Sequence, residues 1–500
     1  MKAHGGIAAA ELLSWGPARS PSMFGECVTL PHPFQETFDV RHLILRFRVL
    51  LPALILALGC GPIAAAGTWQ AAVGSLAITP DEPIWMGGYA ARTEPSEGAI
   101  HDLYAKVLIV QDEDGNRIVI VTTDLLGVTP ELRSRIGGHV QRLGIAPESL
   151  LINASHTHCG PELRADRLER YGVDSQFAAK AQQYVQQTAT KIGELIESTL
   201  AKLQPAELQY SFARAGFAMN RRLPTANGFV NSPNPEGPVD HTVPVLRVVS
   251  EDDRLLGILF GYACHATTLG IQQLCGDYPG FAQQYLEESH PGAVALFLNG
   301  CSADQNPYPR RKLELAKQHG RALANAVETA LETRLTYDIS GPLSVAMESA
   351  TLEFQPPPSR DELEELAASS NRYDRFHATA LLEELEENGR IQTAYDCFPV
   401  QVVQFGEDLT LVAICGEVVV DYALRLKKEL SRGGDHQVWV AGYSNHVFGY
   451  LPSRRVLTEG GYEGGGAMRY TTFPGPFDES VEQRIIDKVK ELVQQSSRAE

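Results

Sequence analysis

The chain has 500 residues, 44% of them hydrophobic, and carries 43 Lys and Arg against 61 Asp and Glu, a formal net charge of −18. This length accommodates one large domain or two to three average ones, and the apolar content is sufficient for a buried core. The negative charge disfavours a nucleic-acid partner and on average repels an anionic membrane surface. We find no basic patch in the sequence that reverses this balance.

The amino-terminal region differs in composition from the rest of the chain. Three basic residues, Arg41, Arg46 and Arg48, precede an apolar run at residues 49–58, and a small-residue stretch follows at residues 64–66. This order of charged, apolar and small residues is typical of a secretory signal peptide. The apolar part is too short to span a bilayer comfortably, so the pattern does not predict a membrane anchor helix.

These features predict three segments. We expect residues 1–43 to be an unstructured upstream extension, residues 44–66 to be the signal peptide, and residues 67–500 to form a secreted or periplasmic catalytic domain. Cys60 offers an alternative, a lipid anchor, although Leu58 stands where a small residue is usual before such a cysteine.

From residue 69 onward, the hydrophobic pattern predicts a single α/β domain with mixed sheets flanked by helices and without internal repeats. Apolar, β-branched runs predict strands at 105–110, 117–122, 149–153, 243–249, 256–263, 293–298, 409–414 and 437–441. Helical periodicity predicts helices at 184–203, 281–288, 311–333, 359–368, 373–388 and 481–493. Segments 227–238 and 460–466 are rich in Gly, Pro and Asn, and we expect them to be loops at the rim of a site.

Five of the predicted strands end in a small residue followed by polar side chains. In α/β sheets, binding and catalytic sites gather just beyond the carboxyl ends of strands, where small residues let the backbone approach a ligand closely. We therefore expect these five ends to build one active site. The polar residues that follow them are His156 and His158 after Asn153, His265 after Cys264, Ser302 after Asn299, Glu417 after Cys415, and Tyr443 and Asn445 after Ala441.

Imidazole and carboxylate groups among these residues suit a catalytic zinc ion. In an extended chain residues two apart face the same side, so His156 and His158 can point into one cavity. Spacing nominates these two with His265 and Glu417 but does not rank them. His101 and His446 compete on composition alone.

The six cysteines after the leader contain no Cys-x-x-Cys pair, so a thiolate zinc cluster is not indicated. Four of them, Cys159, Cys264, Cys301 and Cys415, flank the polar residues named above, and we expect them to be small buried fillers. A disulfide between Cys264 and Cys275 stays open as an alternative in an exported protein.

Several of these segments together resemble the neutral/alkaline (non-lysosomal) ceramidases. They are Ser-His-Thr-His-Cys-Gly-Pro at 155–161, Tyr-Ala-Cys-His-Ala-Thr at 262–267, Cys-Gly-Glu at 415–417, Gly-Tyr-Ser-Asn-His-Val-Phe-Gly-Tyr at 442–450 and Gly-Tyr-Glu-Gly at 461–464. The resemblance implies a catalytic domain without the immunoglobulin-like carboxyl-terminal domain of the family's long forms. It also implies an amphiphilic N-acyl substrate presented at a membrane surface, and no obligate protein partner is evident.

The resemblance further implies that His156, His265, Glu417 and Tyr450 bind one zinc ion. Composition would not nominate Tyr450, because a phenol with a pKa near 10 is an uncommon metal ligand. The same likeness assigns His158 and Arg221 to contacts with the substrate or transition state. Arg222 is a rival for Arg221, and His101 also matches a segment of the family, which places it near the site.

Ser302 corresponds to a serine of the family, but the surrounding turn differs. The family has Gly-Asp-x-Ser-Pro-Asn, whereas residues 299–307 here read Asn-Gly-Cys-Ser-Ala-Asp-Gln-Asn-Pro. No Gly-x-Ser-x-Gly elbow surrounds Ser302, which disfavours a serine hydrolase. We therefore expect a zinc-dependent amidase that uses metal-activated water, with Ser302 as a hydrogen-bonding group of the catalytic site.

Two alternatives stay open at this point. One is a zinc hydrolase that acts on another N-acyl or peptide-like substrate. The other is a zinc-stabilised binding protein without turnover, which hydrolytic activity in the zinc-loaded protein would exclude.

Overall fold

The computed structural model describes residues 69–431 and 436–496. The predicted upstream extension, the signal peptide and Cys60 lie outside these residues. None of the helices in the described part combines the length and apolar character that crossing a bilayer requires.

The larger of the two main sheets has nine strands. Its order is β10 (Val294–Asn299), β9 (Leu255–Tyr262), β8 (Thr242–Ser250), β5 (Gln204–Arg214), β1 (Trp69–Ala77), β2 (Tyr104–Gln111), β3 (Arg117–Thr123) and β4 (Leu150–Ala154), with β12 (Tyr337–Asp338) paired to β5. The pairs β3–β4 and β9–β10 are parallel and the other pairs are antiparallel. The carboxyl ends of β4, β9 and β10 all carry predicted site residues.

The second main sheet packs face to face against the first. Its order is β13 (Leu343–Glu353), β14 (Ala394–Phe405), β15 (Leu409–Ile414) and β17 (Gln437–Ala441). Alternation along each strand divides its side chains between two cores. In β15, Leu411 joins the core between the two sheets, whereas Val412 and Ile414 join the core on the opposite face.

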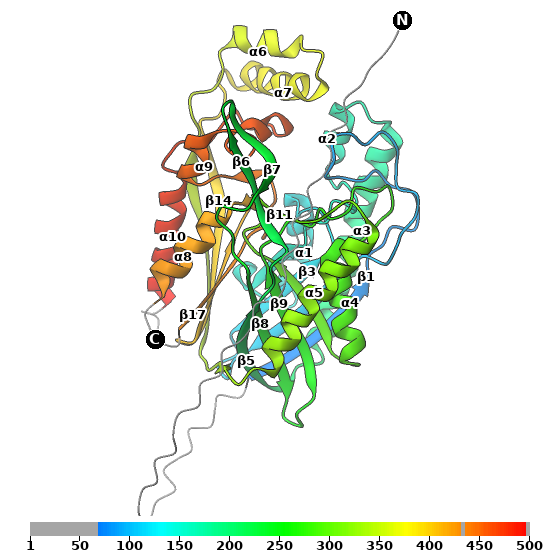
Figure 1. Cartoon of the computed structure of the whole chain (residues 1–500), viewed down its shortest axis with the longest axis vertical. Helices are drawn as coiled ribbons and strands as arrows, with labels where there is room; N and C mark the ends of the chain where they lie inside the picture. The colour runs from blue at the N-terminus through cyan, green and yellow to red at the C-terminus, as the bar shows by residue number, and fades with distance from the viewer. Residues whose placement is uncertain (1–68, 432–435, 497–500) are drawn as a thin grey trace, which may run out of the picture. The chain divides into compact units, whose positions relative to one another are not determined.

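Helices cover the outer faces of both sheets, which gives four layers (Figure 1). Helices α1 (Pro130–Arg142), α3 (Ser175–Leu200), α4 (Asp277–Ser289) and α5 (Leu313–Glu332) contribute to the cores on the outer face of the nine-stranded sheet. Helices α8 (Val420–Leu430) and α10 (Val481–Ser496) cover the second sheet. This arrangement confirms the predicted class, mixed sheets flanked by helices.

Smaller elements complete the described fold. They are α2 (Ala165–Arg170), α9 (Arg454–Glu459), the 3-10 helices Pro147–Ser149 and Gly466–Tyr470, the sheet β11 (Gln305–Pro307), β6 (Ala218–Thr225) and β7 (Gly228–Asn234), and the pair β16 (Glu417–Val418) and β18 (Tyr450–Leu451). Helices α6 (Arg360–Ala367) and α7 (Arg372–Asn388) form a hairpin at one end of the domain (Figure 1) with a small core of its own around Leu363 and Leu381.

All eight predicted strands and all six predicted helices are present. The prediction of a loop at 227–238 is wrong for most of its length, because β7 pairs with β6 in an antiparallel hairpin. The turn of this hairpin contains Asn227-Gly228, with Gly228 at a φ of 98°, a conformation that glycine adopts without steric cost. Segment 460–466 is a loop as predicted.

The cysteines behave as fillers rather than as a cross-link. Cys159, Cys264, Cys275, Cys301 and Cys415 are buried free thiols, so Cys264 and Cys275 form no disulfide.

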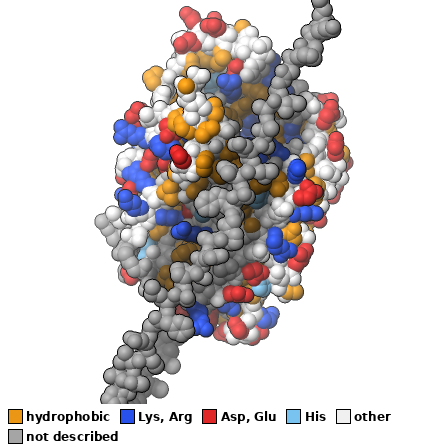
Figure 2. Space-filling view, viewed as in Figure 1, with side chains coloured by type: hydrophobic (Ala, Val, Ile, Leu, Met, Phe, Trp, Pro, Cys, Tyr) orange, Lys and Arg blue, Asp and Glu red, His pale blue; other side chains and the backbone are white. Residues whose placement is uncertain are grey.

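On the face shown in Figure 2, acidic and basic side chains are interspersed over the surface.

Candidate metal centre

The five predicted strand ends do converge. Asn153, at the end of β4, donates from Nδ2 to the Gly442 carbonyl beyond β17 at 2.7 Å, and its Oδ1 accepts from the Asn299 backbone N–H of β10 at 2.8 Å. Tyr443 N–H in turn donates to the Gly416 carbonyl beyond β15. Beyond the strand ends, the side-chain amide of Asn153 and a backbone hydrogen bond replace the hydrogen bonds between strands. These bonds hold the loops that carry the site residues.

Two imidazoles are held with the same nitrogen facing inward. Nδ1 of His156 lies 2.5 Å from the Leu126 carbonyl, and Nδ1 of His265 lies 3.0 Å from the Ser302 carbonyl. Because a carbonyl oxygen only accepts, each Nδ1 carries the proton and each neutral ring presents an unprotonated Nε2. Carbonyl partners of this kind orient histidine ligands in metal sites.

The unprotonated nitrogens point at one another. His156 Nε2 and His265 Nε2 are 3.1 Å apart, and Glu417 Oε2 lies 3.3 Å from the first and 3.4 Å from the second. Two lone pairs and a carboxylate at these distances repel one another unless a cation lies between them. Nitrogen ligands of a tetrahedral zinc ion are about 3.3–3.4 Å apart, so the three groups fit a metal ion.

Burial and neighbouring side chains keep His265 and Glu417 in the protonation states that a metal requires. Burial lowers the pKa of His265 to about 4, so this ring is neutral at pH 7. For Glu417 burial alone raises the pKa, but the adjacent His156 and His265 hold it well below its usual range. The site therefore offers the neutral imidazole of His265 and the carboxylate of Glu417 without a change of protonation.

His158 completes a buried group of three histidines, and its Nε2 lies 3.1 Å from Nε2 of His156. Burial, together with the two neighbouring imidazoles, holds the pKa of His158 well below the usual value. Its Nδ1 is buried and has no hydrogen-bond partner among the described residues. His158 therefore lacks the carbonyl anchor that both His156 and His265 have.

Tyr450 reaches the site through the short parallel pair β16–β18, in which it lies directly beside Glu417. Burial raises the pKa of Tyr450 well above 10, although Arg221 opposes this. Arg221 Nη2 donates to the Tyr450 hydroxyl at 2.9 Å. The phenol is thus neutral beside Arg221 unless a metal ion next to it favours ionisation.

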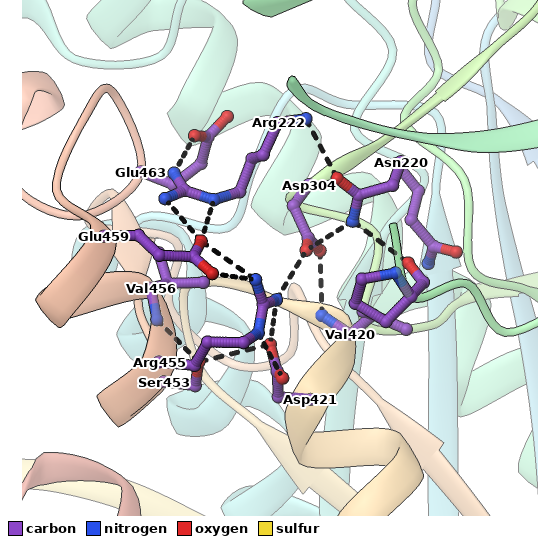
Figure 3. Close-up of polar contacts among 12 residues, drawn as sticks. Asn220, Arg222, Asp304, Val420, Asp421, Ser453, Arg455, Val456, Glu459 and Glu463 are labelled. Carbon is purple, nitrogen blue, oxygen red and sulfur yellow. Dashed lines mark hydrogen bonds and ion pairs between the residues drawn. The ribbon is translucent and has the colours of Figure 1, made fainter. Parts of the chain in front are cut away.

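A buried ionic network holds Arg221 in this position, and Figure 3 shows the part of it around Arg222. Glu463 Oε1 accepts from Arg221 Nε at 2.7 Å, and its Oε2 accepts from Arg222 Nη1 at 2.6 Å. Arg222 also pairs with Glu459 at 3.1 Å. The geometry distinguishes the two rivals, because Arg221 contacts Tyr450 whereas Arg222 bonds to Glu459, Glu463 and the Gly460 carbonyl.

Comparison with known proteins identifies the family of the amino-terminal part of the described chain. Residues 70–307 match the sequence model described as neutral/alkaline non-lysosomal ceramidase, N-terminal. This part of the chain, residues 70–307, belongs to the neutral/alkaline ceramidase family. It is 26% identical over 272 residues to the neutral ceramidase of Drosophila melanogaster, across 50% of this chain and 37% of that protein. It is 24% identical over 267 residues to neutral ceramidase 1 of Arabidopsis thaliana, across 49% of this chain and 32% of that protein.

The fold matches a ceramidase of known structure. The neutral ceramidase from Pseudomonas aeruginosa superposes with a TM-score of 0.68 at 19% identity, and the match covers 86% of this chain and 75% of that one. A structure described as a ceramidase complexed with C2 gives a TM-score of 0.67, with 86% and 76% covered. The matches to the fly and plant ceramidases span about a third of those relatives' length.

The remaining predicted residues lie at different distances from the candidate metal centre. Ser302 is fully buried behind His265, with its carbonyl as the partner of the imidazole and its hydroxyl beside the phenol of Tyr443. His101 lines a different cavity, next to Asp124. His446 Nδ1 bonds to the Tyr395 hydroxyl at 2.7 Å. Neither His101 nor His446 is part of the buried group of three histidines.

Two contributors to the centre were missed in the sequence. Glu463 was read only as part of a motif, yet it is the shared partner of two buried arginines. The Leu126 carbonyl, which orients His156, is a backbone group and leaves no trace in residue type. Glu463 pairs with two arginines that lie about 240 residues earlier in the sequence. No local sequence pattern indicates a contact over that separation.

Proposed function

We propose that the chain is an exported, zinc-dependent amidase that hydrolyses the N-acyl amide bond of ceramide or a related N-acyl lipid. The observation that carries this proposal is the pair of Nε2 atoms 3.1 Å apart whose Nδ1 atoms both bond to carbonyls. Membership of the neutral/alkaline ceramidase family supports an amide substrate. Relatives named neutral ceramidase support ceramide as the first substrate to test.

We assign the metal to His156, His265, Glu417 and Tyr450. When bound, zinc lowers the pKa of a coordinated water and polarises the substrate carbonyl. Glu417 brings the negative charge that offsets the cation, and β16–β18 pairing keeps Tyr450 at its side. The Leu126 and Ser302 carbonyls hold the two imidazoles at fixed orientation, which reduces the cost of reorganisation during each turnover.

We assign to His158 and Arg221 the binding of the negative charge that develops on the amide oxygen. His158 is neutral at pH 7, because burial lowers its pKa, and a neutral imidazole offers one N–H donor. Arg221 is fixed by Glu463 and Tyr450 and keeps its positive charge. Loss of one such donor typically costs about 3 kcal/mol of transition-state stabilisation.

The test combines metal analysis with a panel of N-acyl substrates. We expect the purified protein to bind about one zinc ion, and His265→Ala and Glu417→Ala to lose it while they stay folded. His290→Ala is the matched control, because His290 pairs with Glu328 away from the centre and its loss should leave the zinc content unchanged. Stoichiometric zinc in both site variants, or zinc-loaded protein that cleaves no N-acyl amide, would contradict the proposal.

A further inference from the structure

The cavity that opens onto His156 and Glu417 has positively charged walls. Four arginines line it, Arg92, Arg164, Arg167 and Arg372, against two glutamates, Glu162 and Glu417. The chain as a whole has a net charge of −18. Local charge of opposite sign to that of the protein concentrates ligands of the complementary sign in a cleft. A neutral lipid gives no reason for this arrangement.

A continuous row of tyrosine rings leads from the metal centre to the outer wall of this cavity. Successive ring centroids are 4.9–6.4 Å apart, and all five rings line the cavity; in order they are Tyr450, Tyr462, Tyr470, Tyr373 and Tyr171. Aromatic faces of this kind accept the apolar body of an amphiphile, and their hydroxyls accept or donate hydrogen bonds. The row therefore suits the apolar body of an amphiphilic substrate.

Two arginines flank the outer end of this row. The guanidinium of Arg167 lies over the Tyr171 ring at 5.2 Å, and that of Arg372 lies over the Tyr373 ring at 4.8 Å. These two rings meet edge to face with their centroids 4.9 Å apart. Arg167 comes from α2 and Arg372 from α7, so the α6–α7 hairpin supplies one side of the pair.

The charges of these two arginines are poorly neutralised. Arg167 reaches its nearest carboxylate, Glu162, at 3.9 Å, and Glu162 already binds Arg164 with both oxygens at 2.7 and 3.1 Å. Among the described residues, Arg372 donates only to the Ala90 carbonyl and the Tyr373 hydroxyl. Across residues 69–431 and 436–496, no carboxylate lies within ion-pair distance of Arg372.

We propose that the physiological substrate is an N-acyl amphiphile whose amine half carries an anionic group, and that Arg167 and Arg372 bind this group. Guanidinium groups pair with carboxylate, sulfonate and phosphate oxygens through charge-assisted hydrogen bonds. Fatty acyl chains end in a methyl group, so the negative charge belongs to the amine half. This inference rests on the proposed amidase activity and narrows its substrate class.

The test uses amides that differ only at the end of a two-carbon arm. N-decanoylethanolamine is neutral, and N-decanoyl-β-alanine, N-decanoyltaurine and N-decanoylphosphoethanolamine end in carboxylate, sulfonate and phosphate. We expect at least one anionic amide to have a kcat/KM about tenfold or more above that of the neutral amide. The three anions distinguish which head group the arginines select.

Two variants connect this preference to the arginines. Arg167→Gln and Arg372→Gln should each lower kcat/KM for the preferred anionic amide about tenfold, through KM, and leave the neutral amide within about twofold. Arg375→Gln is the control, because Arg375 lies one turn further along α7, is exposed and does not line the cavity. Unchanged thermal unfolding would verify that the variants are folded.

A binding measurement separates this inference from the amidase proposal. Decane-1-sulfonate has no amide bond, and decyl methyl sulfone is its neutral analogue. The wild-type protein should bind the sulfonate about tenfold more tightly than the sulfone, and both Gln variants should lose this difference. Equal binding of the two probes, or a kcat/KM preference for the neutral amide, would overturn the inference. Selective sulfonate binding without hydrolysis of any amide would instead refute only the amidase proposal.

Discussion

The buried carboxylate of Glu463 offers the sharpest test of how the site is held together. Its side chain is 3% exposed and binds Arg221 at 2.7 Å and Arg222 at 2.6 Å. Glu463→Gln keeps the shape of the side chain but removes its charge and turns an amide N–H₂ toward a guanidinium. Arg222 then retains Glu459, whereas Arg221 retains only neutral partners, Tyr450 and Asn306.

The magnitude follows from burial. Removal of one partner from a buried ion pair costs about 3–5 kcal/mol, because the other charge stays buried and unpaired. Since glutamine still offers one acceptor oxygen, we expect the free energy of unfolding to fall by about 3 kcal/mol. Glu459→Gln is the matched control. Its side chain is 20% exposed, so we expect a loss of about 1 kcal/mol or less.

The loss of unfolding free energy caused by Glu463→Gln should also depend on pH. Burial raises the pKa of Glu463, but Arg221 and Arg222 overcome this and hold it below the usual value. A carboxyl with a lowered pKa in the folded state stabilises the fold above its unfolded-state pKa of about 4.3, and this stabilisation is lost as pH falls through the folded-state value. The difference between wild type and Glu463→Gln should therefore shrink below about pH 4.3.

Urea unfolding followed by far-UV circular dichroism at pH 7 and at pH 4 measures both quantities. The reasoning is refuted if Glu463→Gln and Glu459→Gln lose equal stability at pH 7. It is also refuted if the deficit of Glu463→Gln grows as the pH falls. A selective loss at pH 7 that diminishes in acid is the outcome that supports a buried, shared carboxylate.

Two further predictions concern chemistry and export. Ser302→Ala should leave measurable turnover without a burst of amine, because it removes at most one hydrogen bond, whereas His156→Ala should abolish turnover by removing zinc. Steady-state and stopped-flow assays measure this, and a folded, zinc-loaded Ser302→Ala without activity would instead favour a covalent serine route. In an exporting host, cleavage should occur near Ala66 and leave Gly67 close to the new amino terminus. A stable intracellular product that keeps residues 54–58 would contradict this prediction, which amino-terminal sequencing tests.

The convergence of the site was predictable because it depends on a local pattern that repeats. Each strand end places a small residue before a polar one, as in Cys264-His265 and Cys415-Gly416-Glu417, and parallel or neighbouring strands bring such ends to one edge. The strand boundaries also followed from apolar runs: the ranges predicted at 409–414 and 437–441 are those of β15 and β17.

Two of the missed strands are partly exposed, and one helix begins earlier than predicted. Strand β5 alternates buried and exposed residues and ends in Arg214, so it contains no continuous apolar run. Strand β7 is mostly exposed and includes Pro233, and its composition resembled a loop although Asn227-Gly228 is a strong hairpin signal. Helix α3 begins at Ser175, nine residues before the predicted start, because Asp174 caps it with a side-chain bond to Gln176 N–H.

The backbone of the site is strained at three residues that follow strand ends. His156, Tyr443 and Asn445 have φ values of 61°, 52° and 64°, a left-handed region that costs non-glycine residues about 1 kcal/mol or more each. This conformation turns the backbone just beyond the ends of β4 and β17.

Asparagine side chains compensate for this strain where the strand ladders end. Asn445 Oδ1 accepts from the Ile152 N–H at 3.1 Å and from Arg133 at 2.6 Å, while its Nδ2 donates to Gln401 at 2.7 Å. Asn153 bridges β10 and the loop after β17 in the same manner. Each amide both donates and accepts, so it replaces a missing backbone partner on either side. The strained turns persist because the surrounding hydrogen bonds, distributed over four strands, outweigh the cost of each one.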